Sequence, residues 1–202
     1  MPLYKTIKHQ DTQVYLWKYD ETDILDAEKL IEKENIEKVQ KYRNKKLTEF
    51  IMIRALKNID FPEDKILYKA TGEPYFGSTQ KHLSITHSFP FAGLAIAKNK
   101  VGIDLEKVQP KIQKLSPKFI NANEEKWLKK EVDYLTIIWC IKEALYKLHP
   151  SKHWSLKKHY EVFPFELNTL DKISCRVFDE NTEDFYTAKV MKMEDYYLAI
   201  VQ

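Results

Sequence analysis

Two short segments of this 202-residue chain hold side chains whose types and spacing could do chemistry. In the first, Asp104 and Glu106 stand two positions apart in an apolar run of β type, so both carboxylates should project from one face of a strand. In the second, Trp139, Glu143 and Lys147 recur at every fourth residue and should line one side of a helix. The stretch between the segments is mostly polar and long enough to bring the helix back against the strand. We therefore expect the three carboxylates to converge.

Three converging carboxylates predict a site for a hard metal ion. Oxygen ligands with no accompanying His or Cys favour Mg²⁺ over zinc or copper, and Mn²⁺ is an alternative that the sequence leaves open. We expect Asp104, Glu106 and Glu143 to be the metal ligands, with Lys142 and Lys147 beside a place for phosphate. Taken singly, each feature has a plainer explanation. Asp104 could be a residue of a strand-end turn, and Glu143 with Lys147 could be a surface helix pair.

Length, composition and charge limit the class of protein. The chain is 44% hydrophobic and has four glycines, which excludes a disordered or low-complexity polypeptide. Its formal charge of +3 is a mild basic bias, below the charge density of nucleic-acid-binding proteins. Two cysteines make neither a disulfide framework nor a zinc site, and no apolar run approaches membrane-spanning length. We therefore expect a cytoplasmic protein with no nucleic-acid partner and no membrane partner.

Hydrophobic periodicity divides the chain into two similar halves. In the first half it predicts strands over 13–19, 82–86 and 92–97, and helices over 23–36 and 38–58. In the second half it predicts helices over 123–130 and 133–149, and strands over 173–178, 185–193 and 196–201. The last strand of each half carries a similar alternating apolar pattern, which supports the division only weakly because such strands look alike.

Two motifs give this chain a resemblance to a known family. Residues 101–106 read V-G-I-D-L-E, and residues 139–147 read W-C-I-K-E-A-L-Y-K. They match the signature of the 4′-phosphopantetheinyl transferases at every fixed position: (V/I)-G-(I/V)-D-x-E, followed by (F/W)-(S/C/T)-x-K-E-(S/A)-x-x-K. The resemblance implies the α+β fold of the longer members, with two similar halves related by a pseudo-twofold, each a small antiparallel sheet packed with a long helix. It also implies a monomer that is an internal pseudo-dimer. Residues 1–100 would form the coenzyme A nucleotide side, and 101–202 would hold the metal ligands and the catalytic helix.

The same resemblance implies an activity. It is the Mg²⁺-dependent transfer of 4′-phosphopantetheine from coenzyme A to a serine of an apo acyl or peptidyl carrier protein, with adenosine 3′,5′-bisphosphate as the leaving group. Asp104, Glu143, Lys142 and Lys147 would be the catalytic residues, and the two lysines would stabilise phosphate charge. Glu143 could be a metal ligand, the base that accepts the serine proton, or both. Carriers of fatty-acid, polyketide, nonribosomal-peptide and lysine biosynthesis all present such a serine, so the sequence leaves the carrier open.

Further contacts to coenzyme A are implied in the first half. Lys45 aligns with a basic residue that holds the 3′-phosphate, and Arg43 and Lys46 are close enough to leave the choice open. Thr86 and His87 match an (S/T)-H-S element in which the His meets a phosphate. Taken without the motifs, His87 would be explained as a surface or packing histidine, and the lysines around 45 as a solvated helix face. The full set of expected coenzyme A-binding residues is Lys45, Lys69, Thr86, His87, Lys142 and Lys147.

One position departs from the family pattern. The chain reads Gly72-Glu73-Pro74 where relatives commonly read Gly-Lys-Pro, and a carboxylate repels a phosphate. Lys69, in the same loop, could compensate for that charge. The departure bears on the affinity for coenzyme A and leaves the reaction itself unaffected.

Residues 109–130 are the expected docking segment for the carrier protein. They set apolar side chains among lysines, which suits an acidic partner, although an ordinary amphipathic connector explains the pattern equally well. Two other functions compete with the transferase. A Mg²⁺-dependent phosphodiesterase or nucleotide hydrolase could use the same carboxylates with water in place of serine. A non-catalytic module that binds coenzyme A or a carrier protein is the other alternative.

Overall fold

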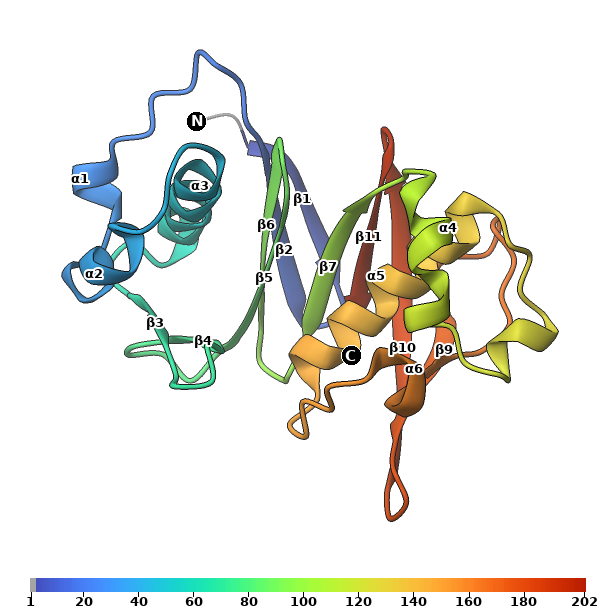
Figure 1. The fold of residues 1–202 in the computed structure, drawn as a ribbon. Coiled ribbons are helices and arrows are strands. Elements are labelled where there is room, and N and C mark those ends of the chain that lie inside the picture. The colour runs from blue at the N-terminus through green and yellow to red at the C-terminus, as the bar shows by residue number, and fades with distance from the viewer. Residues whose placement is uncertain (1–2) are drawn as a thin grey trace. The chain divides into compact units, whose positions relative to one another are not determined.

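The structure is a computed structural model that describes residues 3–202. The chain divides into two compact units, residues 1–100 and residues 101–202, and each has its own main sheet and its own long helix (Figure 1). Over the described part of the chain, no helix combines the length and the apolar character needed to span a bilayer.

The first unit is built on a four-stranded antiparallel sheet with the order β1-β2-β6-β5. Its strands are β1 (Leu3–His9), β2 (Thr12–Lys18), β5 (His82–Ser88) and β6 (Phe91–Ala97). Every residue of β6 is buried, and the strand lies between two hydrogen-bonded neighbours, β2 and β5. A separate two-stranded sheet pairs β3 (Ile66–Tyr68) with β4 (Pro74–Phe76).

The long helix of the first unit is α3 (Lys45–Asp60), which packs against β6 of the sheet. Met52 and Leu56 of the helix share one apolar cluster with Leu94 and Ile96 of the strand. The predicted helix over 38–58 begins later than expected because Asn44 has a φ of 44°, outside the right-handed helical region. The predicted helix over 23–36 is wrong, since no long helix forms there. The stretch contains only the short elements α1 (Ala27–Leu30) and η1 (Lys33–Asn35), and a third short element, α2 (Ile36–Val39), begins at its last residue.

The second unit is built on a five-stranded antiparallel sheet with the order β7-β11-β10-β9-β8. Its strands are β7 (Gly102–Lys107), β8 (Tyr160–Val162), β9 (Ile173–Phe178), β10 (Glu183–Met193) and β11 (Tyr196–Val201). Short helical turns connect them: α4 (Lys111–Leu115), η2 (Ser116–Lys118), η3 (Glu124–Lys126) and α6 (Leu156–His159). The predicted helix over 123–130 is therefore wrong in extent, because only the η3 turn forms there.

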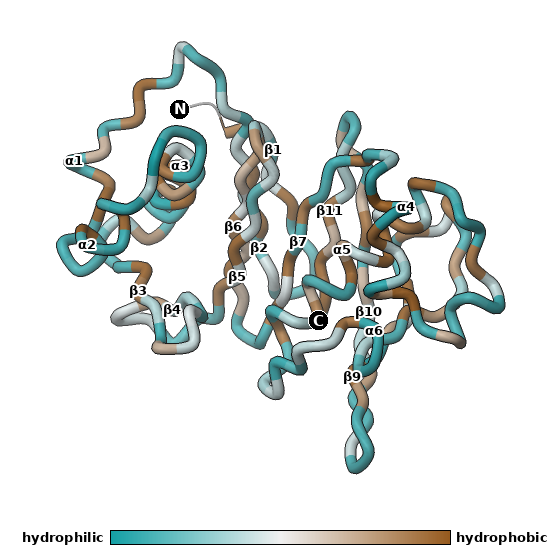
Figure 2. The backbone as a smooth tube through the Cα atoms, viewed as in Figure 1, coloured by the Kyte–Doolittle hydropathy of each residue, from teal (hydrophilic) through white to brown (hydrophobic). Residues whose placement is uncertain are grey.

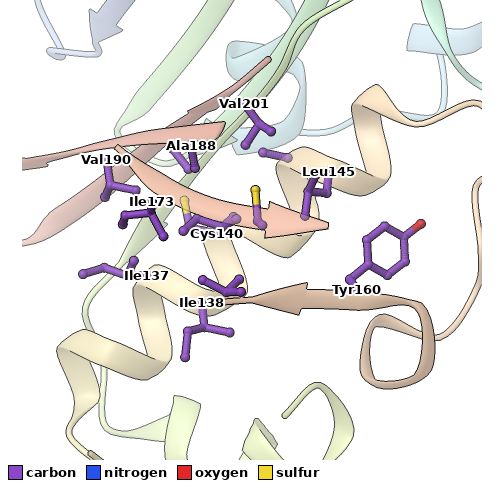
Figure 3. Packing of buried hydrophobic residues seen from close by; sticks show 14 of the residues in the cluster. Ile137, Ile138, Cys140, Leu145, Tyr160, Ile173, Ala188, Val190 and Val201 are labelled. Carbon is purple, nitrogen blue, oxygen red and sulfur yellow. The ribbon is translucent and has the colours of Figure 1, made fainter. Parts of the chain in front are cut away.

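The long helix of the second unit, α5 (Val132–Leu148), lies on β7 and β11 and supplies much of the core. Figure 3 shows side chains of the helix, among them Ile137 and Leu145, packed with strand residues such as Ile173 and Val201. Gly102 determines how close the helix can come. A Cβ at that position would lie 1.9 Å from the carbonyl oxygen of Ala144, so only glycine allows this contact between backbones.

The fold agrees with the α+β class, since antiparallel sheets and helices make up both units. Figure 2 shows apolar residues gathered along the strands and hydrophilic residues on most connecting loops. The pseudo-twofold relation between the halves stays a prediction.

Candidate active site

The two sequence motifs meet where α5 lies against β7. Trp139 donates its indole N–H to Oε1 of Glu106 over 3.1 Å. Eight residues along the helix, Lys147 Nζ lies 2.7 Å from Oδ1 of Asp104 and donates to the carbonyl oxygen of Ile103 over 2.9 Å. The helix side that carries Trp139 and Lys147 thus reaches both acids of the strand.

Glu143 lies on the same helix side, midway between Trp139 and Lys147. Burial, together with the negative charge of Asp104, raises the pKa of Glu143 to about 7, while Lys147 opposes the shift. Burial and the charge of Asp104 also raise the pKa of Glu106, against the hydrogen bond from Trp139. Each shift has a neighbouring carboxylate among its causes, so the three acids repel one another.

The chemistry of Asp104, Glu106 and Glu143 suits a hard cation, because all three offer carboxylate oxygens as ligands. A divalent ion would relieve the repulsion that contributes to the raised pKa values of Glu106 and Glu143. As the side chains stand, however, residues 3–202 contain no group of three His, Cys, Asp or Glu residues arranged to hold a metal ion. An oxygen of Asp104 is occupied by Lys147 instead, so metal binding would require a side-chain rearrangement at this ion pair.

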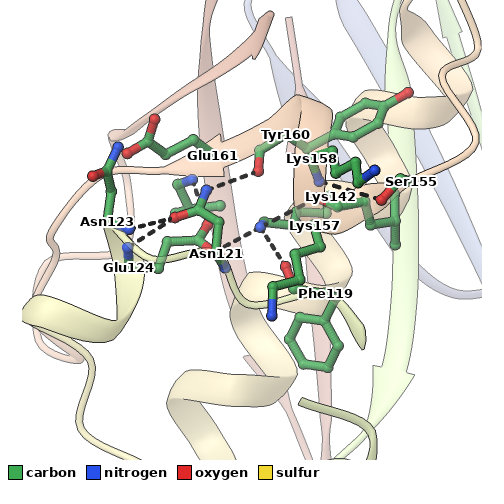
Figure 4. Close-up of polar contacts among 12 residues, drawn as sticks. Phe119, Asn121, Asn123, Glu124, Lys142, Ser155, Lys157, Lys158, Tyr160 and Glu161 are labelled. Atoms are coloured by element: carbon green, nitrogen blue, oxygen red, sulfur yellow. Dashed lines mark hydrogen bonds and ion pairs between the residues drawn. The ribbon is translucent and has the colours of Figure 1, made fainter. Parts of the chain in front are cut away.

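Lys142 lies in a different environment from its neighbour Glu143. Its side chain is fully buried and forms a 2.7 Å ion pair with Glu124, which is also fully buried (Figure 4). Its Nζ donates in addition to the carbonyl oxygens of Phe119 (2.6 Å) and Leu156 (3.4 Å). Burial lowers the pKa of Lys142 and raises that of Glu124, and their contact opposes both shifts. The ammonium group of Lys142 thus has three acceptors within the protein, whereas the resemblance implies that it contacts a phosphate.

Glu124 is a site-adjacent residue that the sequence reasoning missed. It accepts a hydrogen bond from the backbone N–H of Asn121 over 2.9 Å, and Asn121 Oδ1 accepts one from the N–H of Glu124 over 2.9 Å. This reciprocal pair is a capping box, and its signature, a capping side chain followed three positions later by Glu, is readable in the sequence. The other oxygen of Glu124 accepts from the N–H of Val162 over 2.9 Å. The Lys142–Glu124 pair therefore connects α5 to the loop before η3 and to β8.

In the first unit, two of the predicted coenzyme A contacts lie in one region. His87, near the end of β5, has its Nδ1 3.3 Å from Oε2 of Glu49 on α3. Lys45, the first residue of α3, lies over the ring of Phe89 at 4.9 Å. Because Phe89 follows β5 directly, Lys45 and His87 both lie where the beginning of α3 meets the end of that strand. Thr86, one residue before His87, is buried.

Two other residues of the first unit have partners close by. Lys69 forms a 3.2 Å ion pair with Glu73, so the charge that departs from the family pattern is balanced within its own loop. Arg54 is buried, pairs with Glu32 at 3.0 Å, and stacks over the ring of Phe50 at 3.4 Å. These contacts explain why an arginine can lie on the apolar side of α3.

Comparison with known proteins identifies the class. Residues 100–201 match the model of the 4′-phosphopantetheinyl transferase superfamily, and the chain belongs to this family. The resemblance seen in the two motifs is thereby confirmed. A similar relative is the 4′-phosphopantetheinyl transferase gsp of Aneurinibacillus migulanus, 29% identical over 96 residues. That alignment covers 44% of this chain and only 40% of the relative's length.

Proposed function

We propose that this chain transfers the 4′-phosphopantetheine group of coenzyme A to a serine of an apo acyl or peptidyl carrier protein. The observation that carries the proposal is the contact between β7 and α5. It gathers Asp104, Glu106 and Glu143 beside the ammonium group of Lys147. Membership of the family supports phosphopantetheine transfer as the general chemistry.

In the reaction, the serine oxygen forms a bond to the β-phosphorus of coenzyme A while the bond to the leaving adenosine 3′,5′-bisphosphate breaks. The serine proton passes to a base, and Glu143 suits this role because its pKa of about 7 allows it to hold or release a proton near neutral pH. Lys147 stabilises negative charge on the transferred phosphoryl group. Lys142 acts through its ion pair with Glu124, which holds α5 in place beneath the site.

Asp104, Glu106 and Glu143 would hold Mg²⁺, with Mn²⁺ as the alternative. When bound, the cation supplies charge neutralisation at the pyrophosphate oxygens. Lys45, Lys69, Thr86 and His87 are the proposed coenzyme A contacts of the first unit, with Arg43 and Lys46 as alternatives to Lys45.

The test is to incubate the protein with coenzyme A, Mg²⁺ and an apo acyl carrier protein and to weigh the carrier by mass spectrometry. We expect a gain of one phosphopantetheine, abolished by EDTA and by replacing the carrier serine with alanine. Glu143→Gln should abolish transfer, whereas the matched variant Glu180→Gln, at an exposed glutamate outside the expected docking segment, should retain it. Coenzyme A consumed without any gain in carrier mass would indicate the hydrolase. Binding without transfer across a panel of carriers would indicate the non-catalytic module.

A further inference from the structure

The loop that follows the catalytic helix, residues 149–155, presents a large aromatic side chain to solvent. Trp154 is 94% exposed, although tryptophan is among the side chains that gain most from burial. The three other tryptophans, at positions 17, 127 and 139, are buried or half-buried. Exposed tryptophans that lie on rigid supports are the usual anchors of protein–protein interfaces.

This loop is tied down on both sides of Trp154. Lys152 Nζ donates to the carbonyl oxygens of Tyr146 and Lys147 at the end of α5, over 3.0 and 2.5 Å. The ring of His153 stacks on that of His159 at 4.3 Å, and the hydroxyl of Tyr160 donates to the carbonyl oxygen of His153 over 3.2 Å. Because the loop is already ordered, a partner that buries Trp154 pays little conformational entropy.

The same loop is also held to the sheet and to the next helix. His149 Nε2 lies 2.9 Å from Oδ2 of Asp184 at the start of β10. Ser155 caps α6 by accepting from the N–H of Lys158 over 3.3 Å. The loop is therefore fastened to the end of α5, the helix whose Lys147 contacts Asp104, and Trp154 lies two residues along the chain from that attachment at Lys152.

The sequence on either side of Trp154 is basic, while two acids of the neighbouring hairpin, Asp179 and Asp184, are paired with His153 and His149 of the loop. Residues 149–160 include three lysines and no Asp or Glu, and residues 107–123 include four lysines and no Asp or Glu. The two stretches touch where Lys157 Nζ donates to the carbonyl oxygen of Pro117 over 3.2 Å. Within these stretches, we call the exposed lysines that lie on α4, η2 or α6 the basic rim: Lys111, Lys114, Lys118, Lys157 and Lys158.

We propose that Trp154 is the apolar anchor of a docking surface, bordered by the basic rim, for an acidic folded protein domain. This inference rests on the proposed function, under which that domain is the apo carrier protein whose serine enters the site. The apolar side chain needs an apolar depression on the partner, and the basic rim needs carboxylates around it. The surface extends the expected docking segment, 109–130, by a loop that neither family motif includes.

Steady-state kinetics with Trp154→Ala tests the anchor. We expect the KM for the carrier to rise about tenfold or more, as for other interface anchors, with kcat at saturating carrier and the KM for coenzyme A unchanged. Trp154→Phe should recover much of the loss. The matched control is Ile24→Ala, which removes a 96% exposed apolar side chain from the first unit and should leave all three constants unchanged. An unchanged KM for the carrier in Trp154→Ala would overturn the proposal.

Direct binding separates this inference from the proposed function. An apo carrier whose serine is replaced by alanine cannot be modified, but it should still dock, shift the tryptophan emission of the wild-type protein to the blue, and cause no such shift in Trp154→Phe. If wild type and Trp154→Ala bind this carrier equally well, the anchor is refuted even where transfer is observed. If the wild-type protein transfers no phosphopantetheine but binds the carrier through Trp154, the docking role of Trp154 is supported and the proposed transferase function is refuted. A blue shift with anionic vesicles or RNA, and none with the carrier, would also overturn the proposal.

Discussion

Replacing Glu143 by glutamine should stabilise the metal-free protein at alkaline pH. The carboxyl pKa rises from the model-compound value of 4.5 to about 7, because the group is buried and faces Asp104 and Glu106. One pKa unit corresponds to about 1.4 kcal/mol, so the ionised side chain costs about 3 kcal/mol of folding free energy once fully charged. Glutamine has a similar shape and carries no charge, so it removes this cost.

The sign of the pH dependence follows from the direction of the shift. With its pKa raised, folded Glu143 keeps its proton between pH 4.5 and about 7, where the unfolded chain has lost it. The contribution of Glu143 to the free energy of unfolding must therefore fall as pH rises through this window and level off above it. The advantage of Glu143→Gln over wild type should be small at pH 5 and nearly complete at pH 8.5.

Urea denaturation in EDTA at these two pH values measures the effect, with Glu125→Gln as the control at an exposed glutamate. The advantage of Glu143→Gln should grow by about 2–3 kcal/mol between them, and that of the control should stay constant. Adding Mg²⁺ at pH 8.5 should then stabilise wild type more than Glu143→Gln, since only wild type has the third carboxylate. An advantage independent of pH would refute the electrostatic reasoning, and equal stabilisation by Mg²⁺ would remove Glu143 from the metal ligands.

Three further predictions concern stability and are all checked by chemical denaturation. Gly102→Ala should cost about 3 kcal/mol or more, because its Cβ would meet the backbone of α5; a loss within experimental error would show that the helix can move away. Lys142→Met should cost about 3–5 kcal/mol by leaving Glu124 buried without its cation, and Lys142→Met with Glu124→Leu should cost much less. Equal losses of unfolding free energy in the single and double variants would show that the unpaired charge of Glu124 is not the cause of the destabilisation. Arg54→Met should destabilise the first unit by about 3 kcal/mol, and adding Glu32→Gln should recover part of that loss. If stability does not recover, the loss is due to side-chain packing and not to the unpaired charge of Glu32.

The parts of the fold predicted best are those with strong periodicity. The helix expected over 133–149 is α5 (Val132–Leu148), and the strands expected over 173–178 and 196–201 are β9 and β11. In these segments, the apolar residues that define the period are also the ones that form the core, so local pattern and tertiary packing agree. The contact between the motifs was predictable for the same reason, since side-chain spacing fixes the face on which each residue lies.

Segments without such agreement were mispredicted. The stretch 23–36 has scattered apolar residues, and in α1 none of the residues is buried, so no packing extends its single turn into a helix. The helix expected from residue 38 is interrupted by the left-handed backbone of Asn44, which periodicity does not reveal. The ion-pair partner of Arg54 could not be predicted either, because Glu32 belongs to an irregular segment far away in sequence.

The placement of Lys142 follows from helix geometry once its neighbours are considered together. Successive residues of an α-helix are rotated by about 100°, so a side that holds Trp139, Glu143 and Lys147 cannot also hold Lys142. The structure uses this separation: Glu143 lies toward the acids of β7, and Lys142 points into the interior, where Glu124 meets it at 2.7 Å. The adjacent lysine and glutamate of the motif thus have different surroundings: Lys142 connects α5 to η3 and to the loop before it, and Glu143 lies on the side of the acids of β7. The ion-pair partner of Lys142 could not be predicted from the sequence. The capping box orients Glu124 locally, but only the folded structure shows that this loop packs against α5, where Glu124 meets Lys142.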